Sequence, residues 1–152
     1  SEIKLNSNIG QLARIGYAEF RGGNSTEQLV GMDIVMNRVE SDKFPNTIEG
    51  VITQPWQFSS LNKNDNNRIF YTNPSETLKI QSGKHKGELD KLNHNAWVRS
   101  LSNAIKVYKG SERGISKSAL LYYSPRSMPR DKKGNPTIPK RDFNKLVLRD
   151  LV

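Results

Sequence analysis

The stretch RIGYAEFRGGNS, residues 14–25, joins the end of one expected helix, a pair of glycines and the start of a second helix. Apolar or small residues before and within it recur at the spacing of one buried helix face: Ile9, Leu12, Gly16 and Phe20. This periodicity predicts a helix that begins at residues 6–8 and ends near Phe20, where Gly22 and Gly23 stop it.

Glu19 lies on the apolar side of this expected helix, in its last turn. Desolvation and the negative end of the helix dipole would both raise the pKa of its carboxyl group, as a general acid requires. Arg21 would oppose that shift if it folded back. The stretch alone leaves two interpretations open, a structural glutamate bonded to backbone and a proton donor.

A second helix is expected to begin with a capping box formed by Ser25 and Gln28 and to run through Val39. Apolar residues occupy most of its circumference, which predicts a central, largely buried helix. Its one polar strip contains Asp33, Asn37 and Glu40. These side chains either border a cleft or pair with neighbouring lysines and arginines.

The remaining segments predict a mainly α (α+β) fold with a few short strands, in a single domain over residues 1–152. A short helix through Val51 and Ile52, capped by Asn46 and Glu49, should precede the loop QPWQFSS, and a longer helix should cover Asn95 to Lys109. The segment SALLYYSP, residues 118–125, favours a strand, and the tail from residue 143 a last helix or strand.

Composition narrows the function classes without choosing among them. Lysine and arginine number 24 against 15 acids, a net charge of +9 that favours nucleic acid, an anionic membrane face or a bacterial wall as partner. The absence of cysteine excludes disulfides, thiolate nucleophiles and zinc–thiolate sites. No run reaches the roughly 18 apolar residues of a membrane span. No leader precedes Ile3, so we expect an export signal to be absent, removed or replaced by another vehicle.

Most catalytic templates are missing from the chain. It has no phosphate-binding glycine loop, no dinucleotide fingerprint, no HExxH pair and no G-x-S-x-G turn. His85 and His94 lie in polar, loop-like surroundings and are expected to be exposed bystanders. Glu19 therefore remains as the candidate for acid catalysis.

Several dispersed motifs occur in a characteristic order: ARIGYAEFRGG, MNRV, KFPNTIEGVITQPWQFSS, NDNNR and ALLYYSP. Together they resemble the SleB-type, spore-cortex-lytic family of cell-wall hydrolases, over about Leu12 to Pro125. The chain departs from the family pattern where Phe20 replaces a small alanine, where Trp56 replaces a glycine, and in its basic tail.

The resemblance implies a small, lysozyme-like domain that cuts peptidoglycan glycan strands between N-acetylmuramic acid and N-acetylglucosamine. By position Glu19 would be the catalytic acid, and no metal or organic cofactor is implied. The residues expected to bind substrate are Arg21 from the same motif, Gln54, Gln57, Phe58 and Ser59 on one cleft wall, and Tyr122 and Tyr123 on the opposite wall.

The outcome of the reaction depends on the number of carboxylates involved. Direct hydrolysis uses two, whereas a lytic transglycosylase manages with one acid that later acts as base. The other acids considered, Asp33, Glu27, Glu40 and Asp65, lie in no motif that singles them out as catalytic. Transfer to a 1,6-anhydro product is therefore favoured, with muramidase hydrolysis as the alternative.

A non-catalytic, cationic module that binds wall or nucleic acid is the third interpretation. The favoured one expects glycan strands as partner, no nucleic acid, and action in the periplasm or extracellular wall. A spore enzyme, a phage lysin and an injected effector all remain open as settings. An injected toxin would also need a cognate inhibitor protein, expected to plug the cleft near Glu19.

Overall fold

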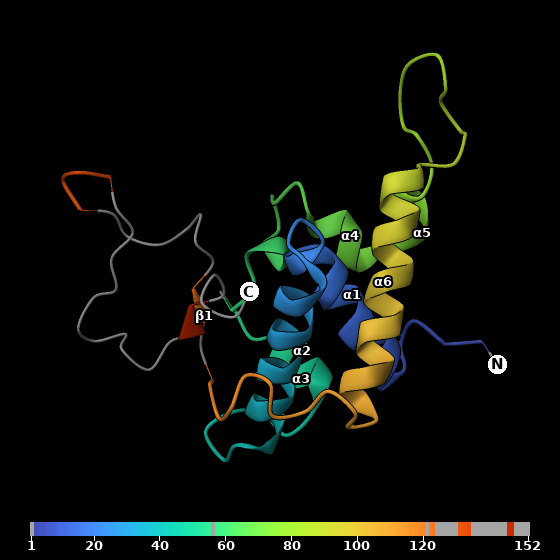
Figure 1. Cartoon of the computed structure of the whole chain (residues 1–152). Coiled ribbons are helices and arrows are strands. Elements are labelled where there is room, and N and C mark those ends of the chain that lie inside the picture. Colours follow the sequence, from blue (N-terminus) through green and yellow to red (C-terminus); the bar gives the residue numbers. More distant parts are fainter. Residues whose placement is uncertain (1, 56, 121, 124–130, 135–145, 148–152) are drawn as a thin grey trace.

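The computed structural model describes residues 2–55, 57–120, 122–123, 131–134 and 146–147. The chain is mainly helical, which confirms the predicted fold class (Figure 1). The elements are α1 (Asn8–Phe20), α2 (Ser25–Glu40), α3 (Ile48–Ile52), the 3₁₀ helix η1 (Ser59–Leu61), α4 (Arg68–Thr72), α5 (Pro74–Thr77), α6 (Lys91–Tyr108), β1 (Tyr122–Tyr123) and β2 (Leu146–Val147).

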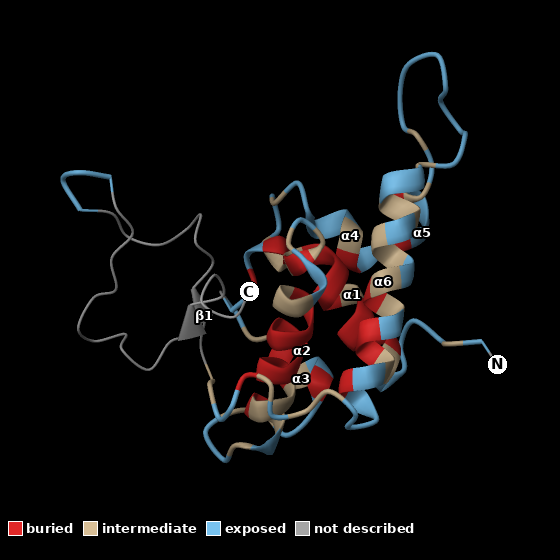
Figure 2. Cartoon of the chain, in the orientation of Figure 1, coloured by how far each residue is buried: buried red, intermediate tan, exposed pale blue. Residues whose placement is uncertain are grey.

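Helices α1, α2 and α6 pack against one another around the core, and α3 and α4 cover two further sides of α1. Figure 2 shows the buried residues concentrated where these helices meet. Fully buried side chains include Leu12, Ile15, Met32, Val35 and Val51. Burial of such side chains is the main contribution to folding, at about 1.5–3 kcal/mol each.

Close approach between α1 and α2 depends on two glycines. A Cβ atom at Gly16 would lie 2.1 Å from Cε of Met32, and one at Gly31 would lie 2.4 Å from the ring of Phe20. The Phe20 ring thus packs on the α2 backbone, where a larger residue at position 31 would displace it. This contact fixes the end of α1 that carries Glu19.

The predicted span of α1 is confirmed, with Ser7 as its N-cap. The two predicted capping positions that follow are each wrong by one residue. Asn24, not Ser25, caps α2 by accepting a hydrogen bond from the Glu27 N–H at 2.8 Å. Thr47, not Asn46, caps α3. In both places two neighbouring residues have side chains that can cap a helix. The one whose backbone is still extended just before the first helical residue becomes the cap.

Gln28, predicted to belong to a capping box, is instead fully buried between α2 and α6. Its amide nitrogen donates to the Ser100 hydroxyl at 2.7 Å and to the Gly16 carbonyl at 3.2 Å, and its oxygen accepts from Asn103 at 2.7 Å. The buried face of α6 is therefore partly polar, and its Ser100 and Asn103 side chains both bond to Gln28 across the interface.

The last helix begins four residues before the predicted start. Asp90 caps α6 by accepting from the Asn93 N–H at 3.0 Å, and Gly110, with φ +92°, follows the helix end as predicted. Helix α4 was not predicted, because its apolar residues form too short a run to show a helical period. Between α5 and α6 the chain extends away from the helices as a hairpin-like loop (Figure 1).

The predicted strand in SALLYYSP is confirmed as β1. It pairs in parallel with β2, so that Tyr122 is opposite Leu146 and Tyr123 opposite Val147. Of the two structures predicted for the tail, a helix or a strand, residues 146–147 form the strand. Most of the basic segment between β1 and β2 lies outside the described residues.

Candidate active site

Glu19 lies in the last turn of α1 with its side chain half-buried. Its Oε2 accepts one hydrogen bond, from the backbone N–H of Ser60 at 3.2 Å. Ser60 is the last residue of the QPWQFSS motif and lies in η1. The fold therefore brings the predicted acid and the predicted cleft loop into contact, across 41 positions of sequence.

Burial is the largest cause of a raised pKa at Glu19, and the negative charge of Asp65 raises it further. The hydroxyl of Ser60 and the backbone N–H groups of Ser60 and Ser59 act in the opposite direction because they stabilise the carboxylate. Desolvation prevails, so the pKa of Glu19 lies above its ordinary value. A fraction of the acid is then protonated at a pH where an exposed glutamate has lost its proton.

Arg21 folds back onto the end of α1, as considered above, but its contacts are not with Glu19. Its guanidinium donates to the Ala18 carbonyl at 3.0 Å and to Oδ1 of Asn67 at 2.7 Å, and it lies 3.4 Å from the centre of the Phe70 ring. Burial lowers the pKa of Arg21, and electrostatic interactions with Tyr17 and Glu19 oppose that shift. Within the described residues no ion pair involves Glu19.

The predicted wall residues occupy different environments in the structure. Gln57 and Ser59 are exposed beside Glu19's partner Ser60, whereas Gln54 is half-buried. The side-chain oxygen of Gln54 is buried and accepts no hydrogen bond from the described part of the chain. Gln57 and Ser59 therefore expose polar groups to a ligand, whereas the unpaired oxygen of Gln54 is covered.

Phe58 departs from its expected place on the groove surface. It is 2% exposed and belongs to the main core cluster, with the Arg38 guanidinium 5.6 Å from its ring centre. An aromatic ring in a short loop gains more free energy by packing on the core than by facing water. Phe58 therefore fixes the loop and does not offer its ring to a sugar.

Tyr122 and Tyr123 form β1, but their side chains lie outside the described structure. Their place as the opposite wall stays a prediction. Ser60, Asp65 and Asn67 are the residues whose part in this site was missed or undervalued. Ser60 is the second serine of QFSS, and Asp65 appeared only as one of several spare acids, because a sequence does not show which turn folds back over α1.

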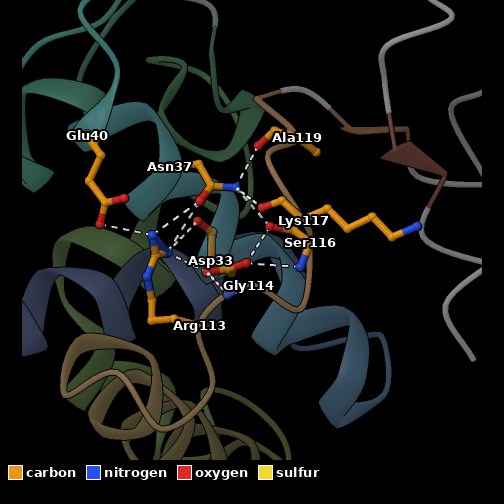
Figure 3. Close-up of polar contacts among 8 residues, drawn as sticks. All are labelled: Asp33, Asn37, Glu40, Arg113, Gly114, Ser116, Lys117 and Ala119. Atoms are coloured by element: carbon orange, nitrogen blue, oxygen red, sulfur yellow. Dashed lines mark hydrogen bonds and ion pairs between the residues drawn. The ribbon is translucent and has the colours of Figure 1, made fainter.

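The polar strip of α2 pairs with a basic residue, as one of the two alternatives predicted. Arg113 contacts the carboxylates of both Asp33 and Glu40 (Figure 3). A cavity of about 480 Å³ also borders the strip, lined by Asn37, Glu40, Ser41, Arg113, Gly114, Lys117, Ser118 and Leu120. Glu19 is not part of that lining. Three of the lining side chains, Asn37, Glu40 and Arg113, are bonded to one another, which leaves the surroundings of Glu19 as the better candidate for the active site.

Two further features concern the described residues only. No helix among them has both the length and the apolar character needed to cross a membrane. Nor do three His, Cys, Asp or Glu side chains gather there as a metal ion would require. His85 is exposed and pairs with Glu88 at 2.8 Å, as expected of a surface residue.

The sequence profile described as Cell Wall Hydrolase matches residues 23–140. The chain belongs to the cell wall hydrolase family. The SleB-type resemblance is confirmed, although Glu19 itself lies four residues before the matched segment. The assignment of Glu19 as the candidate acid therefore depends on its position and contacts in the structure.

Two curated relatives are spore cortex-lytic enzymes. One from Bacillus cereus is 33% identical over 87 residues, which cover 57% of this chain and 30% of the relative. Another from Bacillus subtilis (strain 168) is 32% identical over 74 residues, 49% of this chain and 23% of the relative. The chain thus spans less than a third of their length in these alignments. No solved structure matches it.

Proposed function

We propose that this cell wall hydrolase cleaves the glycan strands of peptidoglycan and that Glu19 is the general acid. The observation that carries the proposal is the half-buried Glu19 carboxyl, whose pKa burial raises, next to a loop with unpaired polar side chains. The names of the relatives, spore cortex-lytic enzymes, support a wall substrate. Action at the cell wall follows from that substrate.

In the proposed reaction Glu19 donates its proton to the glycosidic oxygen while the bond from that oxygen to the anomeric carbon breaks. The carboxylate that remains then accepts the proton of the muramoyl 6-hydroxyl, whose oxygen bonds to the anomeric carbon. The products are a free 4-hydroxyl end and a 1,6-anhydro end, with no water consumed. Glu19 returns to its protonated form.

The other acids support this one-carboxylate mechanism. Asp33 is fully buried and bonded to several donors, and Glu40 is held by Arg113, so neither is available to a sugar. Asp65 is the acid whose charge raises the pKa of Glu19, but its Oδ1 accepts from the Asn67 N–H at 2.8 Å. Muramidase hydrolysis would require Asp65 to activate water.

We further propose that Gln54, Gln57 and Ser59 contact the sugars from one side and that β1 supplies Tyr122 and Tyr123 from the other. Amide and hydroxyl groups suit the acetamido and hydroxyl groups of the substrate. Arg21 and Phe58 would act by holding the loop residues in place, since their own contacts are within the protein.

Product masses from purified peptidoglycan test the proposal. Wild type should release fragments one water lighter than hydrolysis products, and Glu19→Gln should release them about 10²- to 10⁴-fold more slowly. Glu49→Gln, which removes an exposed acid from α3, is the matched control and should cleave like wild type. Products with added water would favour the muramidase, and cleavage by Glu19→Gln at a rate close to that of wild type would exclude Glu19 as the acid.

A further inference from the structure

Residues 113–120 connect the end of α6 to β1, and we call them the connector. They contain no helix or strand, and two residues have left-handed backbone, Gly114 with φ +79° and Lys117 with φ +58°. The second is unusual because a side chain disfavours that conformation. A segment of this kind needs contacts from outside itself to keep one shape.

Asp33 of α2 supplies the first of these contacts (Figure 3). Its side chain is fully buried and accepts hydrogen bonds from the Gly114 N–H at 3.3 Å, from the Ser116 N–H at 2.9 Å, from the Ser116 hydroxyl and from Arg113. One carboxylate therefore contacts three residues of the connector. Such charge-assisted bonds are the stronger class of hydrogen bond.

Asn37 and Arg38 continue the same row of contacts toward β1. The Asn37 amide nitrogen donates to the Ser116 hydroxyl at 3.0 Å and to the carbonyls of Lys117 and Ala119 at 3.2 and 2.9 Å. Nε of Arg38 donates to the Leu120 carbonyl at 2.7 Å. The contacted backbone ends two residues before Tyr122, the first residue of β1.

Arg38 also lies close to the QPWQFSS loop. Its guanidinium lies 5.6 Å from the ring centre of Phe58, in the QPWQFSS loop whose end contacts Glu19. Helix α2 thus contacts both the connector before β1 and the loop beside Glu19. The separation of these two segments is therefore set through one rigid element.

We propose that Asp33 is a positioning residue for substrate binding, because it fixes the connector that places β1 and its two tyrosines. The proposal rests on the proposed function. Burying a carboxylate has a large desolvation cost, and apolar packing could hold a segment with no such cost. A carboxylate with several donors does what apolar packing does not: each of its hydrogen bonds fixes the orientation of a particular N–H or O–H group.

Glu40 offers a matched control within the same cluster. It contacts the outer side of Arg113, its side chain is 63% exposed, and among the described residues it accepts no hydrogen bond from the connector backbone. Removing its charge changes the electrostatics of the cluster but leaves the Asp33 contacts in place. Ser116→Ala is the mild second variant, because it removes one hydroxyl that contacts both Asp33 and Asn37.

The experiment compares wild type with Asp33→Asn, Ser116→Ala and Glu40→Gln by two measurements. The first is amide hydrogen exchange over residues 114–123. The second is kcat and KM for soluble glycan strands freed of their peptide stems, at a temperature where every variant used is folded. If Asp33→Asn does not fold, Ser116→Ala alone provides the test.

We expect faster exchange in the connector for Asp33→Asn and Ser116→Ala, and KM raised about three- to tenfold, the effect of losing one or two such bonds. The kcat should stay close to that of wild type, and Glu40→Gln should match wild type in both measurements. A loss of folded protein would lower kcat and leave KM unchanged, so the two effects are separable.

Unchanged KM in both variants, or an equal rise of KM in Glu40→Gln, would overturn the proposal. Unchanged exchange in the connector would overturn it as well. If wild type cleaves no glycan at all, the proposed function fails by itself, and the exchange rates still decide whether Asp33 holds the connector.

Discussion

Glu19 and Asp33 are both carboxylates on central helices, yet their surroundings differ. Glu19 is half-buried at the end of α1, and the groups that stabilise its carboxylate belong to Ser60 and Ser59, with the Ser60 N–H at 3.2 Å. Asp33 is fully buried in the middle of α2. Its Oδ1 accepts hydrogen bonds from Arg113 and Gly114, and its Oδ2 accepts them from Ser116. The donors to Glu19 are neutral groups, whereas the donors to Asp33 include the charged guanidinium of Arg113.

The difference shows that burial alone does not assign a role to a carboxylate. Desolvation without matching donors favours the protonated form, which suits a proton donor. Desolvation matched by several donors, one of them charged, gives a group that joins segments of the fold. The two acids can therefore be told apart by substitutions that remove charge while keeping shape.

Glu19→Gln should have the largest effect, on activity alone. Loss of the proton donor should reduce glycan cleavage by about 10²- to 10⁴-fold. The unfolding midpoint at neutral pH should be unchanged or higher: a carboxyl with a raised pKa in the folded state adds stability at low pH, and this is lost as pH rises through the folded pKa. Zymography and thermal unfolding check the two parts, and a lower midpoint would contradict the assignment.

Asp33→Ala should have the opposite signature, a loss of stability. Removing this partner leaves the Ser116 N–H without its acceptor and takes from Arg113 its buried carboxylate, which should lower the free energy of unfolding by about 3–5 kcal/mol. Glu40→Gln removes the exposed partner of the same guanidinium and should change it by no more than about 0.5 kcal/mol. Denaturant unfolding measures both; equal losses would contradict a special role for Asp33.

Asp65→Asn should have the smallest effect, on pH dependence. Glycan cleavage should decline as pH rises through the raised pKa of Glu19, since the general acid must hold its proton. The charge of Asp65 contributes to that raised pKa, so its removal should move the decline to lower pH. Rates measured across pH for wild type and variant test this. A decline at unchanged pH would separate Asp65 from Glu19.

Much of the helical frame followed from local patterns. The three-to-four spacing of apolar residues predicted α1, the run of mainly apolar residues predicted α2, Gly110 predicted the end of α6, and the apolar, aromatic SALLYYSP predicted β1. Details that depend on how the chain enters an element were not predictable. Asn24 and Thr47 replaced the expected caps, and the polar start of α6 concealed its first turn.

The site was only partly visible in the same way. Glu19 could be found because its place on an apolar helix face is a local feature, and the QPWQFSS loop because its motif is continuous. The larger role of Ser60 could not be distinguished from that of Ser59, since only the packing of η1 on α1 places the Ser60 N–H at 3.2 Å from the acid. The same packing buried Phe58, which had been expected on the surface.

The sequence by itself determined the helical periods, the position of the acid on α1 and the motifs of the family, because each is encoded within a few neighbouring residues. Only the tertiary structure decided that Ser60 and Asp65 act on Glu19, and that Asp33 is joined to residues 80 or more positions away. The physical reason is that donors and charges act through space. Their effect on a carboxyl group depends on distance and burial, which appear only when distant segments pack together.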